Sequence, residues 1–373
     1  MKKTRSSNFE LLRILAMLMI VLFHVMIHWP KDQLLNEGLQ NYYNNGLFNN
    51  PIFYKKLWII NTAMPMGMVG NGLFMMISGY FLSSREEIDL VKISKKILSQ
   101  LGYATIMLVV SSCLIYYTIN QRAERFFLLE KVTVFNSGWW FIGYYYTVLV
   151  IAAFILNKYM IHAEKKNVLS LIVILFSIVE IGWSGSLLDA IGSGLRTVGI
   201  GMFFYLLGGY INKYDPFRNV RGYVLFVVII LANIVNYVSS YNDTNNSIQN
   251  YIRNGSQGKF IQPIYQPACF DILIIILVVS VFEIFKRMKM PNSRMINYLG
   301  ASTFMVYLIH ENVFFRTIYN QSDCITLLYR HPYLFLLEII KWTLISFVAG
   351  VIAYSIFIIG SRISKHFMWI VIK

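Results

Sequence analysis

Cysteine, charged residues and long polar stretches are all scarce in this 373-residue sequence. The three cysteines, Cys113, Cys269 and Cys324, are odd in number and lack metal-ligand spacing, which argues against a disulfide framework and a cysteine-bound metal. The sequence contains no soluble domain, no low-complexity linker and no obvious short-period repeat. It also lacks the ~10-residue alternating segments that are typical of a membrane β-barrel.

Apolar residues make up 57% of the chain, and its mean hydropathy is +0.55. Apolar runs of about 20 residues, long enough to cross roughly 30 Å of hydrocarbon, recur from end to end. They predict an all-α, polytopic membrane helix bundle that forms one domain over residues 1–373. The predicted helices are ten in number and cover residues 9–29, 65–83, 98–119, 138–157, 168–184, 194–212, 222–240, 267–285, 301–319 and 334–360.

The N-terminus, "MKKTRSSNF" followed by an apolar run, resembles a signal peptide. The run is too long for one, and no small-residue cleavage site follows it. We therefore expect a retained first helix.

Basic residues outnumber acidic ones, with 33 Lys and Arg against 18 Asp and Glu and a formal net charge of +15. Such a balance can indicate nucleic-acid binding, but in a membrane protein basic residues mark the cytoplasmic connections. Lys and Arg are concentrated at the two termini and in every second connection. The positive-inside rule therefore predicts that both termini are cytoplasmic, and we expect no nucleic-acid partner.

The two longest outer loops, 30–64 and 241–266, are rich in Asn, Tyr and Gln. Amide and aromatic side chains suit carbohydrate hydroxyls and sugar faces. They equally suit any hydrated loop beside a membrane, so both interpretations stay open.

The first helix carries Glu10, Arg13, His24 and His28 within an apolar run. Arg13 and His24 are eleven residues apart and therefore share one face, about 16 Å apart along the axis. Glu10 precedes Arg13 by three residues and can pair with it. Ionisable residues inside a membrane are costly and face a bundle interior or a water-filled cavity, so this stripe is a candidate functional feature.

Further polar residues lie in the outer halves of the predicted helices and suggest a polar cavity that opens outward. Some of them are expected to be structural ion pairs. His310 and Glu311 are placed near the middle of the ninth helix, where neighbours point about 100° apart and cannot both face one spot. The outer-half residues are Glu180, Arg196, Asp271, Arg316, Glu338 and Lys341.

Four phrases, taken in order along the whole chain, resemble the acyltransferase-3 family of bacterial integral-membrane acyltransferases. The first is an acidic-x-x-Arg pattern with a histidine eleven residues later, here Glu10, Arg13 and His24. The second, third and fourth phrases are "LFMMISGYFL", "WWFIGYYY" and "STFMVYLIH". The glycines in and just before the second phrase allow close helix packing. The two tryptophans that open the third phrase, Trp139 and Trp140, suit a membrane interface.

The resemblance implies transfer of an acyl group, most often acetyl from acetyl-CoA or another acyl-CoA, to a hydroxyl of a surface glycan or its lipid-linked precursor. Such proteins lie in the cytoplasmic membrane of bacteria. High Ile, Asn, Lys and Tyr content indicates an AT-rich genome, which favours a Gram-positive source and capsule or exopolysaccharide as acceptor. The acetyl and succinyl donors, the acceptor and the oligomeric state stay open.

The resemblance also implies roles for particular residues. His24 is the candidate base for the acceptor hydroxyl, or else an acyl carrier. Arg13 and Glu10 would orient the helix end or contact the donor. The coenzyme A phosphates would meet Lys92, Lys95 and Lys96, where the family has arginines; lysine binds phosphate as a point charge, without the guanidinium fork. Acceptor-side or supporting candidates are His310, Tyr307, Ser78, Tyr80, Trp139 and Trp140.

Two other interpretations fit the same composition, and we expect no metal in any of them. A non-enzymatic exporter of a glycan or lipid-linked sugar would share the polar cavity and the topology, without needing His24 or acyl-CoA. A structural subunit of an envelope complex would leave the buried charges unexplained. Relatives with a fused esterase-like domain have a long tail, whereas this sequence stops soon after its tenth helix.

Overall fold

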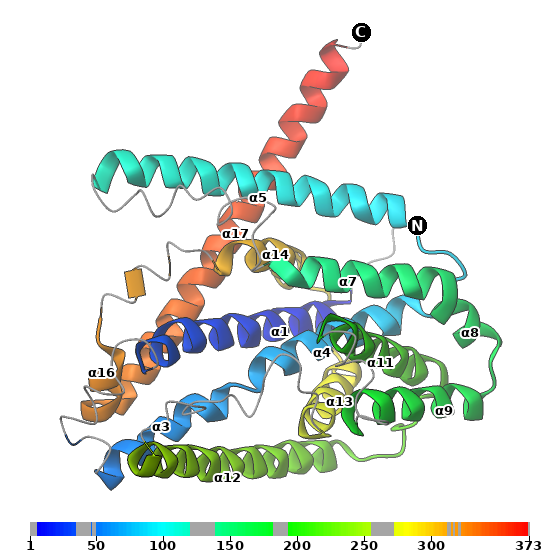
Figure 1. Cartoon of the computed structure of the whole chain (residues 1–373). Helices are drawn as coiled ribbons and strands as arrows, with labels where there is room; N and C mark the ends of the chain where they lie inside the picture. Colours follow the sequence, from blue (N-terminus) through cyan, green and yellow to red (C-terminus); the bar gives the residue numbers. More distant parts are fainter. Residues whose placement is uncertain are drawn as a thin grey trace.

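The computed structural model describes residues 6–34, 46, 50–119, 139–181, 193–254, 272–311, 315, 318–319 and 322–371. Within these ranges the regular structure is helical and contains no strand (Figure 1). The prediction of an all-helical, polytopic membrane protein is thereby confirmed. Six described stretches are long and apolar enough to cross a membrane: Ser7–Pro30, Leu90–Ser111, Trp140–His162, Gly194–Tyr214, Gly222–Asn246 and Pro332–Ile363.

Each of the ten predicted helices overlaps a helix of the structure, although several ends differ. The bounds are α1 (Ser7–Met26) with the π-helical turn η1 (Ile27–Lys31), α3 (Pro51–Ala63), α4 (Met66–Leu82), α5 (Leu90–Ile119), α7 (Trp140–Ile151) with η6 (Ala152–Leu156) and α8 (Asn157–His162), α9 (Lys165–Phe176) with η7 (Ser177–Ile181), α11 (Ser193–Tyr214), α12 (Gly222–Asn254), α13 (Ile272–Arg287), α14 (Arg294–His310), α16 (Cys324–Arg330) and α17 (Pro332–Val371).

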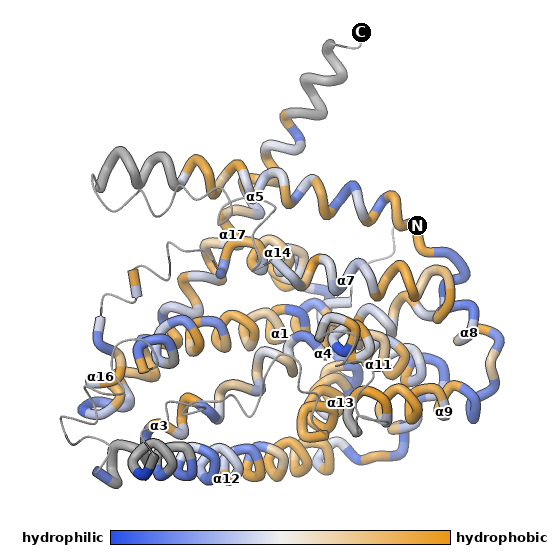
Figure 2. Tube along the Cα trace, in the orientation of Figure 1, coloured by the Kyte–Doolittle hydropathy of each residue, from blue (hydrophilic) through white to orange (hydrophobic). Residues whose placement is uncertain are grey.

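Both predicted outer loops contain helix in their described parts. The loop 30–64 holds α3, which begins at Pro51, a residue suited to the first position of a helix. The loop 241–266 is entered by α12, which continues to Asn254 because neither Gly nor Pro interrupts it before Gly255. Figure 2 shows the change along α12 from an apolar first half to a polar second half.

The ninth predicted helix, 301–319, is displaced toward the N-terminus in the structure. Its counterpart α14 begins after Ser293, whose hydroxyl oxygen accepts a hydrogen bond from the Ile296 N–H, and it ends at His310. His310 and Glu311 therefore lie at a helix end rather than in a helix middle. This shift matters for the site described below.

Helix α1 occupies the middle of the bundle, between α4 and α14, and it also contacts α13 and α17 (Figure 1). Its apolar side chains Leu12, Met17 and Val21 are buried. The polar stripe of α1 is thus held inside protein rather than toward lipid, as intramembrane ionisable residues require.

Hydrogen bonds and ion pairs join the connections that are predicted to be cytoplasmic at one end of the bundle. Glu283 of α13 is fully buried there, and the cations of Lys286 and Arg287 compensate its charge. This grouping agrees with the alternation of helices that the positive-inside rule predicts, while the side of the membrane stays a prediction. The joining contacts are Asn8 Nδ2 to the Phe285 carbonyl (2.9 Å), Lys286 Nζ to Asp215 Oδ1 (2.6 Å), Lys213 Nζ to the Met160 carbonyl (2.6 Å) and Asn157 Nδ2 to the Leu82 carbonyl (2.9 Å).

Helices α4 and α11 approach each other so closely that their backbones touch. A Cβ atom added to Gly79 would lie 1.9 Å from the Tyr205 carbonyl oxygen. The glycine of the "ISGY" phrase is therefore required for packing, and it fixes the neighbouring Ser78 beside the cavity described below.

Replacing Gly79 with alanine should destabilise the protein by at least the about 1–3 kcal/mol that is typical of overpacking, because the added methyl meets backbone and not a flexible side chain. Gly102→Ala on α5 is the matched control, since an added Cβ there meets nothing within 4 Å. Thermal unfolding of the two purified variants in detergent measures the difference. Equal melting temperatures would contradict the α4–α11 contact.

Candidate functional site

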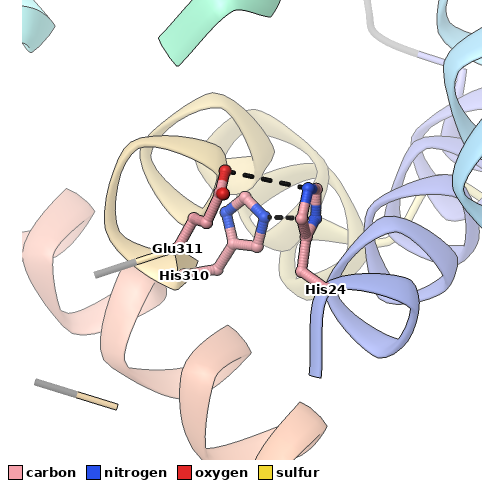
Figure 3. A group of neighbouring side chains, drawn as sticks. All are labelled: His24, His310 and Glu311. Carbon is pink, nitrogen blue, oxygen red and sulfur yellow. Dashed lines mark hydrogen bonds and ion pairs between the residues drawn. The ribbon is translucent and has the colours of Figure 1, made fainter. Parts of the chain in front are cut away.

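Three polar side chains from distant parts of the sequence meet near the C-terminal ends of α1 and α14 (Figure 3). His24 Nδ1 lies 3.0 Å from His310 Nε2, and His24 Nε2 lies 3.7 Å from Glu311 Oε2. The prediction that His310 and Glu311 cannot face one spot is wrong. Because α14 ends at His310, Glu311 adopts φ −93° and ψ 30° and is released from the spacing of a continuous helix.

Hydrogen-bond partners assign the protons on the two imidazoles. A carbonyl oxygen only accepts, so the Tyr307 carbonyl, 2.7 Å from His310 Nδ1, requires the proton on that nitrogen. Nε2 of a neutral His310 then accepts from His24 Nδ1–H, which also faces the Ile20 carbonyl at 3.0 Å. The lone pair of a neutral His24 is thereby assigned to Nε2, on the side of Glu311.

Glu311 also contacts a second histidine of α1. Its Oε1 lies 3.2 Å from His28 Nε2, and His28 Nδ1 lies 3.5 Å from Asp32 Oδ2. The side chains of His24, His28 and Glu311 are between 13% and 16% exposed, so the carboxylate acts in a shielded setting where charge interactions are strong. His28, four residues after His24 on α1, therefore belongs to the same cluster.

The end of α14 and the start of α7 satisfy each other's unpaired backbone groups. The last carbonyls of a helix lack intrahelical partners, and Trp139 Nε1–H donates to the Leu308 carbonyl at 3.1 Å. In return, the Tyr307 hydroxyl oxygen accepts from the Phe141 N–H at 3.1 Å. These two bonds hold the helix end that carries His310 and Glu311.

The donor set could hold a divalent cation, since one ligand atom each from His24, His310 and Glu311 lie within 4.8 Å of one another. Two imidazoles and a carboxylate form a familiar zinc set. The 3.0 Å between the two nitrogens is, however, the length of a direct hydrogen bond. The proton assignment above supplies that bond, and the expectation of no metal stays a prediction.

A cavity of about 260 Å³ lies on the predicted cytoplasmic side of this cluster, among α1, α4, α5, α7 and α14. Ile20 and Tyr307 line its inner end, one helical turn before His24 and His310 respectively. Arg13 and Lys96 line it nearer the predicted cytoplasmic end. The sequence predicts a cavity that opens outward, and the structure adds one on the other side, which ends about one helical turn before the histidines.

Of the predicted donor-binding residues, some line the cavity and others do not. Arg13 lines the cavity, and its Nη1 lies 2.8 Å from Oε1 of the buried Glu10, which holds the guanidinium in place. Lys92, Lys95 and Lys96 are all exposed, and of the three only Lys96 lines the cavity.

The aromatic and hydroxyl candidates are likewise divided. Ser78 lines the cavity, with its hydroxyl 3.2 Å from that of Tyr145, whereas Tyr80 packs against Phe9 in a cluster of aromatic rings. Trp139 is buried against α14, and Trp140 is exposed. Trp139 is thus a packing residue, and only Trp140 has the exposure of an interface residue.

The remaining polar candidates do not reach the cluster within the described residues. Glu338 and Lys341 form an ion pair on α17, as expected for some of this group. Arg196 is partly buried on α11. Asp271 and Arg316 lie outside the described residues, as does the side chain of Glu180.

Sequence reasoning missed one cavity residue that a pattern could have found. Along α5 the residues at i, i+3, i+4 and i+7 share a face, and four of them line the cavity: Ile93, Lys96, Ile97 and Gln100. Gln100 is the polar residue of this stripe that lies deepest in the span.

A family model, Acyl_transf_3, described as an acyltransferase domain, matches residues 6–361. No curated protein and no solved structure gives a significant match.

Removing the Tyr307 hydroxyl should reduce stability by about 1–3 kcal/mol, because the Phe141 N–H would lose its acceptor in a partly buried setting. Tyr307→Phe keeps the ring and the Tyr307 carbonyl that orients His310, so we expect transfer activity to fall less than tenfold. Thermal unfolding and activity of the variant measure the two effects. Unchanged stability with abolished activity would instead place the hydroxyl in the chemistry.

Proposed function

Since the chain belongs to the acyltransferase-3 family, we propose that it moves an acyl group, most often acetyl, from acyl-CoA to a hydroxyl of a cell-surface polysaccharide or of its lipid-linked precursor. One observation carries the proposal. The cavity is lined by Arg13 and Lys96 toward one end, and its other end lies one helical turn before His24. The hydrogen bond between His24 and His310 leaves Nε2 as the basic nitrogen of a neutral His24.

A sugar hydroxyl is a weak nucleophile until a base removes its proton, and a positioned histidine contributes about 10²–10⁴ to such a rate. In the proposed reaction His24 Nε2 takes the hydroxyl proton while the oxygen attacks the thioester carbonyl carbon. The carbon–sulfur bond then breaks, and the leaving thiolate receives the proton from the His24 imidazolium. An ester and a free thiol result, so atoms and charge balance.

His310 and Glu311 support His24 in different ways. His310 accepts the Nδ1–H of His24 and is itself anchored by the Tyr307 carbonyl, so the ring of His24 is held in one tautomer. Glu311 lies 3.7 Å from Nε2, where its negative charge stabilises the imidazolium that forms during transfer. The alternative in which His24 carries the acyl group covalently uses the same nitrogen.

The donor would enter from the end of the cavity lined by Arg13 and Lys96. Coenzyme A carries its phosphates far from the thioester, and cations suit phosphates while an apolar passage suits the chain between them. Arg13 and His24 are about 16 Å apart along α1. One helix would therefore contact the donor at both ends, with Arg13 at the phosphates and His24 at the thioester. The acceptor would approach His24 from the other side.

The proposed setting is the cytoplasmic membrane of a bacterium, with capsule or exopolysaccharide as the acceptor. Its support is the run of membrane-crossing helices and the family match. The match favours an enzyme over the exporter alternative, because the family is one of acyltransferases.

Losing His24 should abolish O-acylation. We expect proton NMR spectra of surface polysaccharide from cells lacking the protein to show no O-acyl signal. Wild type should restore the signal, and His24→Ala should restore less than about a hundredth of it, given the contribution of a general base. His162→Ala, an exposed histidine at the far end of α8, is the matched control and should behave as wild type.

These comparisons require equal membrane abundance of all variants. A full signal with His24→Ala would remove His24 from the chemistry. An O-acyl signal that persists without the protein, together with reduced polysaccharide export, would favour the exporter.

The two adjacent lysines on α5 provide a sharper test of the donor end. Lys96→Met should raise the KM for acyl-CoA about three- to tenfold with little change in kcat, because it removes ground-state binding of phosphate. Lys95→Met removes the same charge from a side chain outside the cavity wall and should change KM less than twofold. Equal effects of the two substitutions would show that only the overall charge of this face matters.

A further inference from the structure

Gln100 is 1% exposed, and its side-chain oxygen Oε1 has no hydrogen-bond partner in the described structure. Buried polar atoms in native proteins are nearly always paired, and an unpaired one costs free energy. Gln100 is also one of the residues that line the cavity, whose inner end lies one helical turn before His24. An unsatisfied acceptor in a cavity wall is suited to a ligand that brings a donor.

Several polar side chains that line the cavity already have hydrogen-bond or ion-pair partners within the protein. Ser78 and Thr303 donate to carbonyls of their own helices, and the Arg13 guanidinium pairs with Glu10. Much of the remaining wall is apolar, including the rings of Phe74, Phe141 and Phe304. Among the residues that line the cavity, Gln100 Oε1 is the one buried side-chain oxygen without a hydrogen-bond partner in the described structure.

Gln100 also lies at a defined level in the cavity. It follows Lys96 by four residues on α5, so it points to the same side and lies about 6 Å farther along the axis. On the predicted direction of α5, this places it deeper than Lys96, toward the end lined by Ile20 and Tyr307. A molecule that reaches from Lys96 to His24 passes Gln100 on the way.

We propose that Gln100 accepts a hydrogen bond from an amide N–H in the pantetheine arm of the acyl donor. This inference rests on the proposed function. The arm joins the phosphates to the thioester and contains two secondary amides. In a donor that extends from Lys96 toward His24, an amide N–H therefore lies between these two residues. Gln100 is accordingly a positioning residue that selects thioesters carrying an amide and sets the depth at which the thioester stops.

A matched pair of small donors tests this directly. One is the acetyl thioester of N-acetylcysteamine, and the other is its ester analogue, in which oxygen replaces the amide N–H. With wild-type protein, kcat/KM should be about tenfold higher for the amide donor. Gln100→Met has a similar shape without the acceptor oxygen and should reduce that preference to below twofold, while the rate with the ester donor stays near the wild-type value.

Stability provides a readout that a merely structural glutamine would not show. Since Oε1 is unpaired in the empty cavity, Gln100→Met should leave the melting temperature without ligand unchanged or higher, and it should reduce the increase that coenzyme A produces. Gln100→Glu, which keeps an acceptor oxygen, should retain the preference for the amide donor. Ser99→Ala, at the exposed neighbouring position, is the control and should retain wild-type behaviour in every measurement.

The outcomes separate this inference from the proposed function. If wild type transfers acetyl from acetyl-CoA but treats the amide and ester donors alike, or if Gln100→Met keeps the preference, the role of Gln100 is overturned and the function stands. If Gln100→Met lowers the melting temperature without ligand, the residue is structural. If wild type transfers no acyl group from acetyl-CoA, the proposed function itself is overturned, and this inference with it.

Discussion

The contact between α1 and α14 brings His24 against His310, and the rest of the site depends on it. The two helices meet along their length, with Glu10 against Gly300 near one end and the two imidazoles 3.0 Å apart near the other. A Cβ at position 300 would lie 2.3 Å from Glu10 Oε2, so the small residue sets the separation of the helices. That separation allows a direct hydrogen bond between residues 286 positions apart.

The same crossing shapes the cavity that approaches the histidines. α5 and α7 close its sides, and the bonds from Trp139 and Tyr307 fix α7 to the end of α14. In the proposed function, one polar stripe on α1 would serve two tasks at two depths, with Arg13 near the phosphates of the donor and His24 near the thioester bond that is broken. An enzyme that transfers a group from a donor on one side of a membrane to an acceptor on the other needs its donor-binding and reacting residues to be separated along the membrane normal, as Arg13 and His24 are along α1.

Much of this organisation follows from sequence, and the failures have physical causes. Hydropathy predicted the helical bundle, and the spacing of Glu10, Arg13 and His24 predicted the stripe. Glu311 was misplaced because a single sequence does not reveal that α14 stops at His310, where tertiary bonds from Trp139 and Tyr307 hold its end. The helical spacing along α5 could have placed Gln100 on the face of Lys96, but the burial of its oxygen without a partner is a property of packing that the sequence does not reveal. Lys92 and Lys95 could not be separated from Lys96 until the orientation of α5 was known.

The most direct test is a transfer assay with the purified protein in lipid vesicles. Acetyl-CoA labelled in the acetyl group would be supplied with glycan and glycolipid extracted from cells that lack the protein. The account predicts that wild type moves label into the extracted acceptor and that His24→Ala does so at least about a hundredfold more slowly, the share expected for a general base. Label transfer by His24→Ala at the wild-type rate would contradict it, because both proposed roles of His24, general base and acyl carrier, need its imidazole.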